Sequence, residues 1–302
     1  MFKYITTISL IIISFISEAA PDTQLLKRLD LERTLFSEQY EKFVLNNQDI
    51  LYVMQENTTA ITLGVAVMIA ESGTSVIGQN GLRPLATQLN DLGWVTILMP
   101  APDVAFLPSL QEPLKPDSPQ SAEQAGGEVT ESTSAKDEIA EFPPPRNRSR
   151  SVESQLNKAA FLKHEEELIA LLQESATRAA NYPGFFLVIA QGTSAAWMTK
   201  IYAEKRLETP DALVTISPFW PDRKLNDTLP TLIAQTPMPV LDLYSESDNE
   251  WSLQTVKHRE VSAIKALKLQ YRQRKMLGFT NINHSSLYLS KEIYGWTSYM
   301  GW

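Results

Sequence analysis

The sequence of 302 residues has no cysteine, only three histidines and a shortage of positive charge. Without cysteine the chain has no disulfide, no thiolate zinc site, no cysteine nucleophile and no lipid-carrying cysteine of a bacterial lipoprotein. Lysine and arginine number 27 against 35 aspartates and glutamates, which gives a net charge of −8. Phosphate binding needs a basic surface, so this balance argues against a nucleic-acid partner.

Several motifs that would indicate a cofactor are also missing. No G-x-G-x-x-G follows a predicted strand, no phosphate-binding loop occurs, and no His/Asp/Glu cluster has metal-ligand spacing. We therefore expect no cofactor and no metal. Beyond the N-terminus no segment is long and apolar enough to cross a bilayer, so we expect no transmembrane segment in the mature chain.

The N-terminal residues have the pattern of a signal peptide. Lys3 precedes an apolar run over residues 4–16, which is too short to span a bilayer, and Ser17 and Ala19 supply small residues at −3 and −1 of a cleavage site. The pattern predicts a signal peptide over residues 1–19 and a periplasmic or secreted mature protein. An uncleaved anchor or a buried N-terminal helix is the alternative.

Residues 107–157 differ in composition from the rest of the chain. They are rich in Pro, Ser, Glu, Gln and Gly and poor in large apolar residues. Such a segment cannot bury enough apolar surface to offset the entropy lost on ordering. We predict a disordered insertion, or a lid that orders only with a partner, with a plain surface loop as the simplest case. The insertion interrupts one domain over residues 20–302.

Helical and strand patterns alternate on both sides of this insertion. Apolar residues at three-to-four spacing predict a helix over residues 21–44. Further on, the patterns predict strands at 50–55, 61–70, 95–99, 185–190, 212–216, 240–244 and 269–277 and helices at 82–92, 157–180, 194–206 and 253–267, with a last helix after His284. This alternation predicts an α/β fold of three layers, with a mostly parallel sheet, helices on both faces and ligands at the carboxyl ends of the strands.

The strand at 185–190 runs through small residues directly into a helix, which is the layout of the hydrolase nucleophile elbow. Two registers fit. In the first, Ala190-x-Gly192-x-Ser194 places Gly192 at the nucleophile position, which leaves no side chain to attack a substrate. In the second, Gly192-x-Ser194-x-Ala196 makes Ser194 the nucleophile. We favour the first register because the apolar run ends at Ala190.

Partners for a nucleophile follow in the order that hydrolases use. Asp248 comes just after the buried strand at 240–244, with Glu246 as a second candidate, although Asp248 could simply form a turn. His284 lies after the last predicted strand, where the base of a catalytic triad belongs. The other two histidines, His164 and His258, fall on charged helix faces, and we expect both to be solvated.

The oxyanion-binding groups of such a site would be backbone N–H groups. One would belong to Thr193, and another to the loop after residue 70, at Ser72 and Gly73. With glycine at the elbow, these groups could hold a carboxylate or carbonyl ligand without cleaving it. Near the C-terminus the positive residues, Arg259 among them, are expected to form a solvated face.

The sequence also resembles a family of exported bacterial α/β-hydrolase-like proteins that is described only as a domain of unknown function. The resemblance rests on Gly81-Leu82-Arg83-Pro84-Leu85, Leu92-Gly93-Trp94-Val95-Thr96, Met99-Pro100, Gln191-Gly192-Thr193, and a tail with His284 and Gly295-Trp296. It covers most of the mature chain outside the insertion. The resemblance implies an α/β-hydrolase fold and no particular substrate. Gly192 departs from active hydrolases, which have serine there.

Two functions remain open from the sequence. In the first, the protein is a pseudoenzyme that binds an unknown small molecule or an envelope protein near Gly192, Asp248 and His284. In the second, it is a periplasmic esterase or acyl hydrolase that uses Ser194, His284 and Asp248. A purely structural role in an envelope assembly, with the insertion as docking segment, has no residues in its favour.

Overall fold

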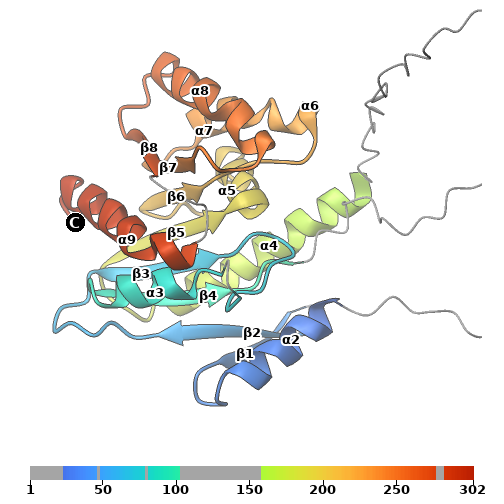
Figure 1. Ribbon diagram of the computed structural model, residues 1–302, viewed down its shortest axis with the longest axis vertical. Helices are drawn as coiled ribbons and strands as arrows, with labels where there is room; N and C mark the ends of the chain where they lie inside the picture. Colours follow the sequence, from blue (N-terminus) through green and yellow to red (C-terminus); the bar gives the residue numbers. More distant parts are fainter. Residues whose placement is uncertain (1–22, 46–47, 79–80, 103–157, 277–281) are drawn as a thin grey trace, which may run out of the picture. The chain divides into compact units, whose positions relative to one another are not determined.

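The computed structural model describes residues 23–45, 48–78, 81–102, 158–276 and 282–302 (Figure 1). The predicted signal peptide and the predicted insertion at 107–157 lie outside the described residues, so both stay predictions. In the described part of the chain, no helix combines the length and apolar character that a membrane span requires.

Eight described strands form a single sheet in the order β1-β2-β4-β3-β5-β6-β7-β8. The strands are β1 (Glu41–Leu45), β2 (Gln48–Gln55), β3 (Gly64–Ile69), β4 (Trp94–Met99), β5 (Phe185–Gln191), β6 (Ala212–Ile216), β7 (Val240–Ser245) and β8 (Tyr271–Met276). All pairs from β4 to β8 are parallel, whereas β1–β2 and β2–β4 are antiparallel. Strand β3 pairs with β4 on one side and β5 on the other, so segments before and after the predicted insertion share one sheet.

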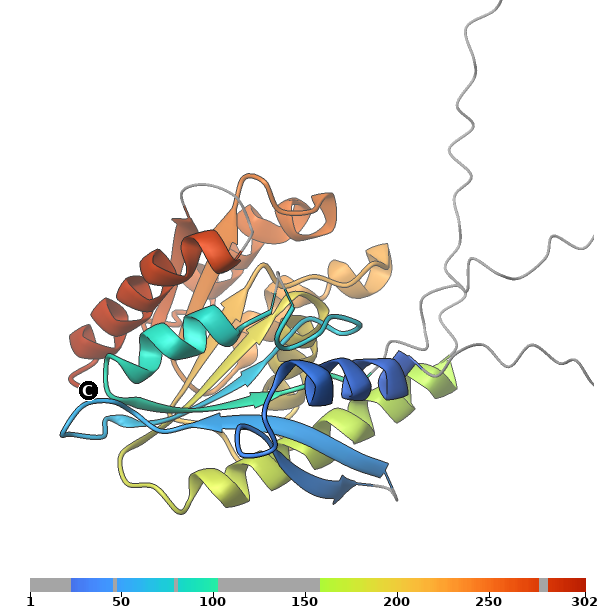
Figure 2. The ribbon, with the colours of Figure 1, turned by 60° about the horizontal axis from the view of Figure 1, so that its bottom comes forward.

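Helices cover both faces of this sheet, as the sequence predicts. They are α2 (Thr23–Thr34), α3 (Arg83–Asn90), α4 (Lys158–Ala179), α5 (Gly192–Ala203), α6 (Arg223–Asn226), α7 (Leu229–Gln235), α8 (Glu250–Lys265) and α9 (Ile282–Tyr299). Figure 2 shows α3 and α9 together on one face and α4 on the opposite face. The three-layer α/β prediction is confirmed.

The inner strands are apolar because both of their faces are covered. Every residue of β3, β4 and β6 is buried. On the face covered by α3 and α9, the main core includes Met68, Ile189, Leu85, Leu289 and Trp296. Burial on both sides explains why these strands read as continuous apolar runs rather than as alternating patterns.

The structure corrects the N-terminal helix prediction. Helix α2 ends at Thr34, and residues 41–45 form strand β1 instead of continuing the helix. In β1 only Phe43 is buried, and the strand pairs with β2 from Glu41↔Tyr52 to Leu45↔Gln48. The segment is a strand because it pairs with β2, and the spacing of apolar residues within the segment gives no information about that pairing.

Candidate functional site

The junction between β5 and α5 has the geometry of a nucleophile elbow, with Gly192 at its apex. Gln191 ends the strand in an extended conformation, and Gly192 then has φ +58° as the first residue of the helix. This left-handed conformation is costly for residues with a Cβ, so glycine suits the position. Gly192 is therefore the residue at the turn between strand and helix.

A side chain from the loop after the neighbouring strand β3 fills the space above Gly192. A Cβ atom at Gly192 would lie 2.6 Å from Cδ, 2.7 Å from Cγ and 2.8 Å from Oε2 of Glu71. The sheet register explains this contact, since Ile69 pairs with Ala190, and Glu71 and Gly192 each follow two residues later. A carboxyl group therefore lies directly against the turn at Gly192.

The loop that carries Glu71 is held by its own hydrogen bonds. The Thr74 N–H and the Thr74 hydroxyl both donate to the Glu71 carbonyl oxygen, at 3.0 and 2.7 Å. Gly73, within this turn, has φ +86° and open space around the position of a Cβ. The two predicted oxyanion-loop residues, Ser72 and Gly73, thus belong to the tight turn that positions Glu71.

The predicted acid, Asp248, is a buried carboxyl group in the loop after β7. Its Oδ2 accepts hydrogen bonds from the Ser217 hydroxyl at 2.6 Å and from the Ser245 N–H at 2.9 Å. Its Oδ1 is buried and has no hydrogen-bond partner among the described residues. Ser217 follows β6 with φ +51°, a strained conformation for a residue other than glycine and one that is typical of functional sites.

Both carboxyl groups have pKa values above their ordinary values. Burial raises the pKa of Glu71 above its ordinary value, and the charge of Asp248 raises this pKa further. Burial also raises the pKa of Asp248, and the hydrogen bonds from Ser217 and Ser245 partly offset that increase. The pair can therefore hold a proton at a higher pH than solvated carboxyl groups would.

These shifts predict how the Glu71→Gln substitution changes stability with pH. A folded-state pKa above the unfolded value means that the folded protein binds protons more tightly than the unfolded chain. The free energy of unfolding therefore falls as pH rises above the unfolded pKa values, which are 4.5 for Glu71 and 3.8 for Asp248. Glu71→Gln removes the part of this decrease that comes from Glu71. The free energy of unfolding of the variant, relative to that of the wild type, should therefore increase as pH rises. Urea unfolding from about pH 4 to pH 7 measures this difference.

The control for that prediction is Glu208→Gln, which changes a solvent-exposed glutamate in the same way. The stability of this variant should follow that of the wild type across the range. If Glu71→Gln also gave a pH profile parallel to that of the wild type, the raised pKa of Glu71 would be contradicted.

Ser194 lies inside the protein rather than at the elbow apex. It is the third residue of α5 and is fully buried. Its hydroxyl is 3.2 Å from the Ser72 hydroxyl, which in turn lies 3.4 Å from Nε2 of His164. No hydrogen bond joins Ser194 to Asp248 within the described ranges. Thr193, just before Ser194, is buried and its hydroxyl has no partner among the described residues.

His164 contradicts the prediction of a solvated histidine. It lies on α4 with 2% of its surface exposed, and its ring centroid is 5.3 Å from that of Trp197. The neighbouring Glu165 is also buried and pairs with Lys200 and Arg206. The charged residues around His164 thus form buried ion pairs as well as solvent contacts. His258, by contrast, is exposed as predicted.

Two predicted site residues remain, Glu246 and His284. Glu246 is exposed and pairs with Lys275, so it does not replace Asp248 at the buried site. His284 belongs to the first turn of α9, whereas the sequence analysis placed it in a loop before that helix. Its side chain lies outside the described residues. No group of three His, Asp or Glu side chains that could hold a metal occurs in the described part of the chain.

Comparison with known proteins identifies the family. The sequence matches the family described as "Protein of unknown function (DUF3530)" over residues 12–299. The chain belongs to this family. A search of the curated proteins finds no match. Membership of DUF3530 agrees with the resemblance noted in the sequence.

Solved structures similar to this DUF3530 protein are α/β hydrolases. The esterase domain of a Rhodothermus marinus protein matches with a TM-score of 0.51 and 10% identity, covering 85% of this chain and 96% of that chain. Est1E from Butyrivibrio proteoclasticus matches with a TM-score of 0.54 and 8% identity, covering 86% of this chain and 97% of that chain. A dienelactone hydrolase from Anabaena variabilis matches with a TM-score of 0.47 and 14% identity, covering 86% of this chain and 98% of that chain. At these identities the first two matches establish the α/β-hydrolase fold alone.

Proposed function

We propose that this DUF3530 protein is an exported pseudoenzyme of the α/β-hydrolase fold, which binds a ligand at the carboxyl edge of its sheet without serine chemistry. One observation carries the proposal: the Glu71 carboxyl group occupies the position of the elbow nucleophile above Gly192. Ser194 is fully buried and its hydroxyl lies 3.2 Å from the Ser72 hydroxyl, so it is poorly placed for an attack on a bound ester. A nucleophile must be accessible to the substrate and hydrogen-bonded to its base.

The polar groups near the elbow support binding. The Thr193 hydroxyl and Asp248 Oδ1 are buried without hydrogen-bond partners among the described residues. Buried polar atoms normally have partners, so these two atoms indicate a site completed by water or by a ligand. Export is supported by the N-terminal pattern alone. An N-terminus at Ala20 on the chain recovered from the source cell would support it, whereas one at Met1 would contradict it.

A fluorophosphonate probe tests directly whether the protein lacks serine chemistry. Such a probe reacts with activated serines, and we expect no labelling of the wild-type protein and no hydrolysis of short-chain p-nitrophenyl esters above the uncatalysed rate. Mass spectrometry of the probe-treated chain and an absorbance assay measure the two outcomes.

The contrary outcome corresponds to the alternative function, an acyl hydrolase that uses Ser194, His284 and Asp248. In that case the wild type would be labelled, and Ser194→Ala would abolish both labelling and ester hydrolysis. Ser72→Ala is the matched control, because it removes the neighbouring hydroxyl and leaves Ser194 in place. Labelling that depends on Ser194 and survives Ser72→Ala would overturn the proposal.

A further inference from the structure

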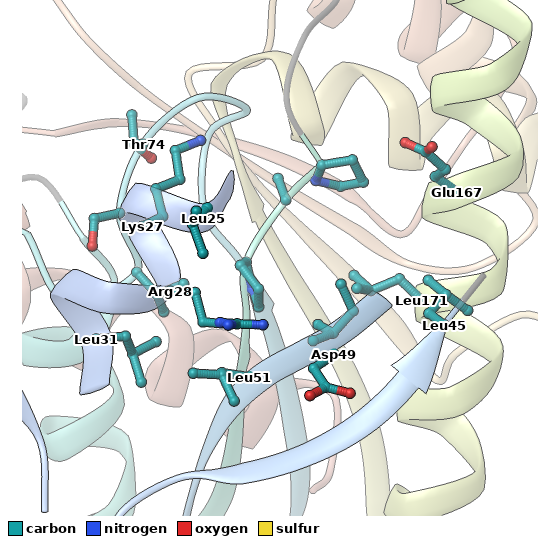
Figure 3. Close-up of a pocket in the computed structure, with 16 residues that line it drawn as sticks. Leu25, Lys27, Arg28, Leu31, Leu45, Asp49, Leu51, Thr74, Glu167 and Leu171 are labelled. Carbon is teal, nitrogen blue, oxygen red and sulfur yellow. The ribbon is translucent and has the colours of Figure 1, made fainter. Parts of the chain in front are cut away.

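A cavity of about 350 Å³ lies between α2, the β1–β2 strands, the loop after β3, the end of β4 and α4 (Figure 3). Its volume is within the range of small-molecule sites in proteins. Much of its lining is apolar and buried, with Leu31, Leu51, Val76 and Leu171 as the main contributors. None of the elbow residues lines it, although the loop that carries Glu71 continues directly to Thr74, Ser75 and Val76 in its wall.

One charged side chain in this lining has a buried nitrogen atom without a hydrogen-bond partner among the described residues. Arg28 on α2 is half-buried, and its Nε is buried without a hydrogen-bond partner in the described part of the chain. Figure 3 shows the Arg28 side chain pointing from α2 into the cavity, toward the strand that carries Leu51 and Asp49. A guanidinium group next to apolar surface gains most from an anionic acceptor, because carboxylates and phosphates match its hydrogen-bond geometry.

The other charges in the lining are better accommodated. Asp49 is exposed to solvent, and Glu167 already pairs with Lys163 on α4 at 3.7 Å. The electrostatic preference of the cavity is therefore set by Arg28 on α2, whose Nε has no hydrogen-bond partner among the described residues.

We propose that this cavity binds an amphipathic monocarboxylate, with its carboxylate on Arg28 and its apolar body against Leu31, Leu51 and Leu171. The volume has room for roughly a dozen water-sized groups. That size fits a medium-chain alkyl carboxylate. The proposal goes beyond the elbow site, since it holds whether or not the elbow cleaves esters.

Isothermal titration with three probes of equal chain length tests the charge preference. Octanoate should bind saturably, octanol about tenfold or more weakly, and octylamine more weakly still, because only octanoate can accept hydrogen bonds from Arg28 as an anion. Equal binding of octanoate and octylamine would overturn the proposal, as would the absence of saturable octanoate binding.

Variants on α2 test the assigned residue. Arg28→Gln should weaken octanoate binding about tenfold or more while leaving octanol binding within about twofold. The matched control is Arg33→Gln, which removes the same charge from the same helix at an exposed position outside the cavity lining. Unchanged octanoate affinity in Arg28→Gln, or an equal loss in Arg33→Gln, would contradict the assignment.

A filling substitution tests the location independently. Leu45 lines the cavity at the end of β1 and is half-buried, so Leu45→Trp can occupy part of the space from the rim. This variant should lose binding of octanoate and octanol together, with an unfolding midpoint close to that of the wild type. Octanoate binding that survives in a folded Leu45→Trp protein would place the ligand elsewhere and overturn the proposal.

Discussion

The substitution Gly192→Ser is expected to lower the free energy of unfolding by about 2–5 kcal/mol and to leave the protein unlabelled by a fluorophosphonate. About 1–2 kcal/mol of this loss comes from a Cβ at φ +58°, and the rest from overpacking against Glu71. The added Cβ would approach three Glu71 atoms within 2.8 Å, so Glu71 or the turn must move. Urea unfolding and mass spectrometry after probe treatment measure the two outcomes.

Gly73 provides a matched control for this substitution. It also has a positive φ, +86°, but open space surrounds the position of its Cβ. Gly73→Ser should therefore show the conformational cost without the steric one. If Gly192→Ser were no more destabilising than Gly73→Ser, Glu71 would not fill the nucleophile position.

A double substitution separates the two contributions further. Glu71→Ala removes the carboxyl group that the new Cβ would meet, so Gly192→Ser should cost about 1–3 kcal/mol less in that background. Additive effects of the two changes would indicate that the side chains do not contact one another. Labelling of the double variant alone would show that Glu71, rather than the shape of the turn, prevents serine chemistry at the elbow.

Replacing Arg259 with alanine is expected to lower the free energy of unfolding by about 3–5 kcal/mol. Arg259 and Asp242 are both fully buried, and their Nε and Oδ2 atoms are 2.8 Å apart. Without the guanidinium group, Asp242 would keep its hydrogen bonds from Tyr271 and Gln273 but would lose its only compensating charge among the described residues. Urea denaturation followed by circular dichroism measures the loss.

The control for this second prediction is Lys257→Ala, an exposed cation on the same helix, whose effect should stay within about 0.5 kcal/mol. Removing both charges with Arg259→Met and Asp242→Leu should recover part of the stability lost by either change alone, because breaking a buried pair costs more than replacing it. An Arg259→Ala effect below about 1 kcal/mol would show that the pair does not carry the stability assigned to it.

The buried pair also corrects the sequence analysis, which placed Arg259 on a solvated basic face. The neighbouring Lys257 and His258 are exposed, as the local charge pattern predicts. Arg259 differs because its side chain turns inward to Asp242 on β7, which lies 17 residues earlier in the chain. A residue's neighbours in the chain carry no signal of such a distant partner.

Much of the fold follows from the sequence because local patterns report burial directly. Strands covered on both faces appear as unbroken apolar runs, and strand β6 lies at residues 212–216 as predicted. The apolar run ends at Ala190, and the turn from strand to helix follows at Gly192. Short elements were missed, since α6 and α7 have too few residues for a periodic signal and β1 depends on pairing with β2.

The site itself required the tertiary structure. The sequence alone determined that the elbow bears no nucleophilic side chain at Gly192 in the favoured register and that an acid follows the strand at 240–244. Only the packed sheet brings Glu71 above Gly192 and Ser217 onto Asp248, and only the packed helices bury His164 beside Ser72. These contacts join strands and helices that are far apart in the chain, and the register between parallel strands is set by packing of the whole sheet rather than by any one segment.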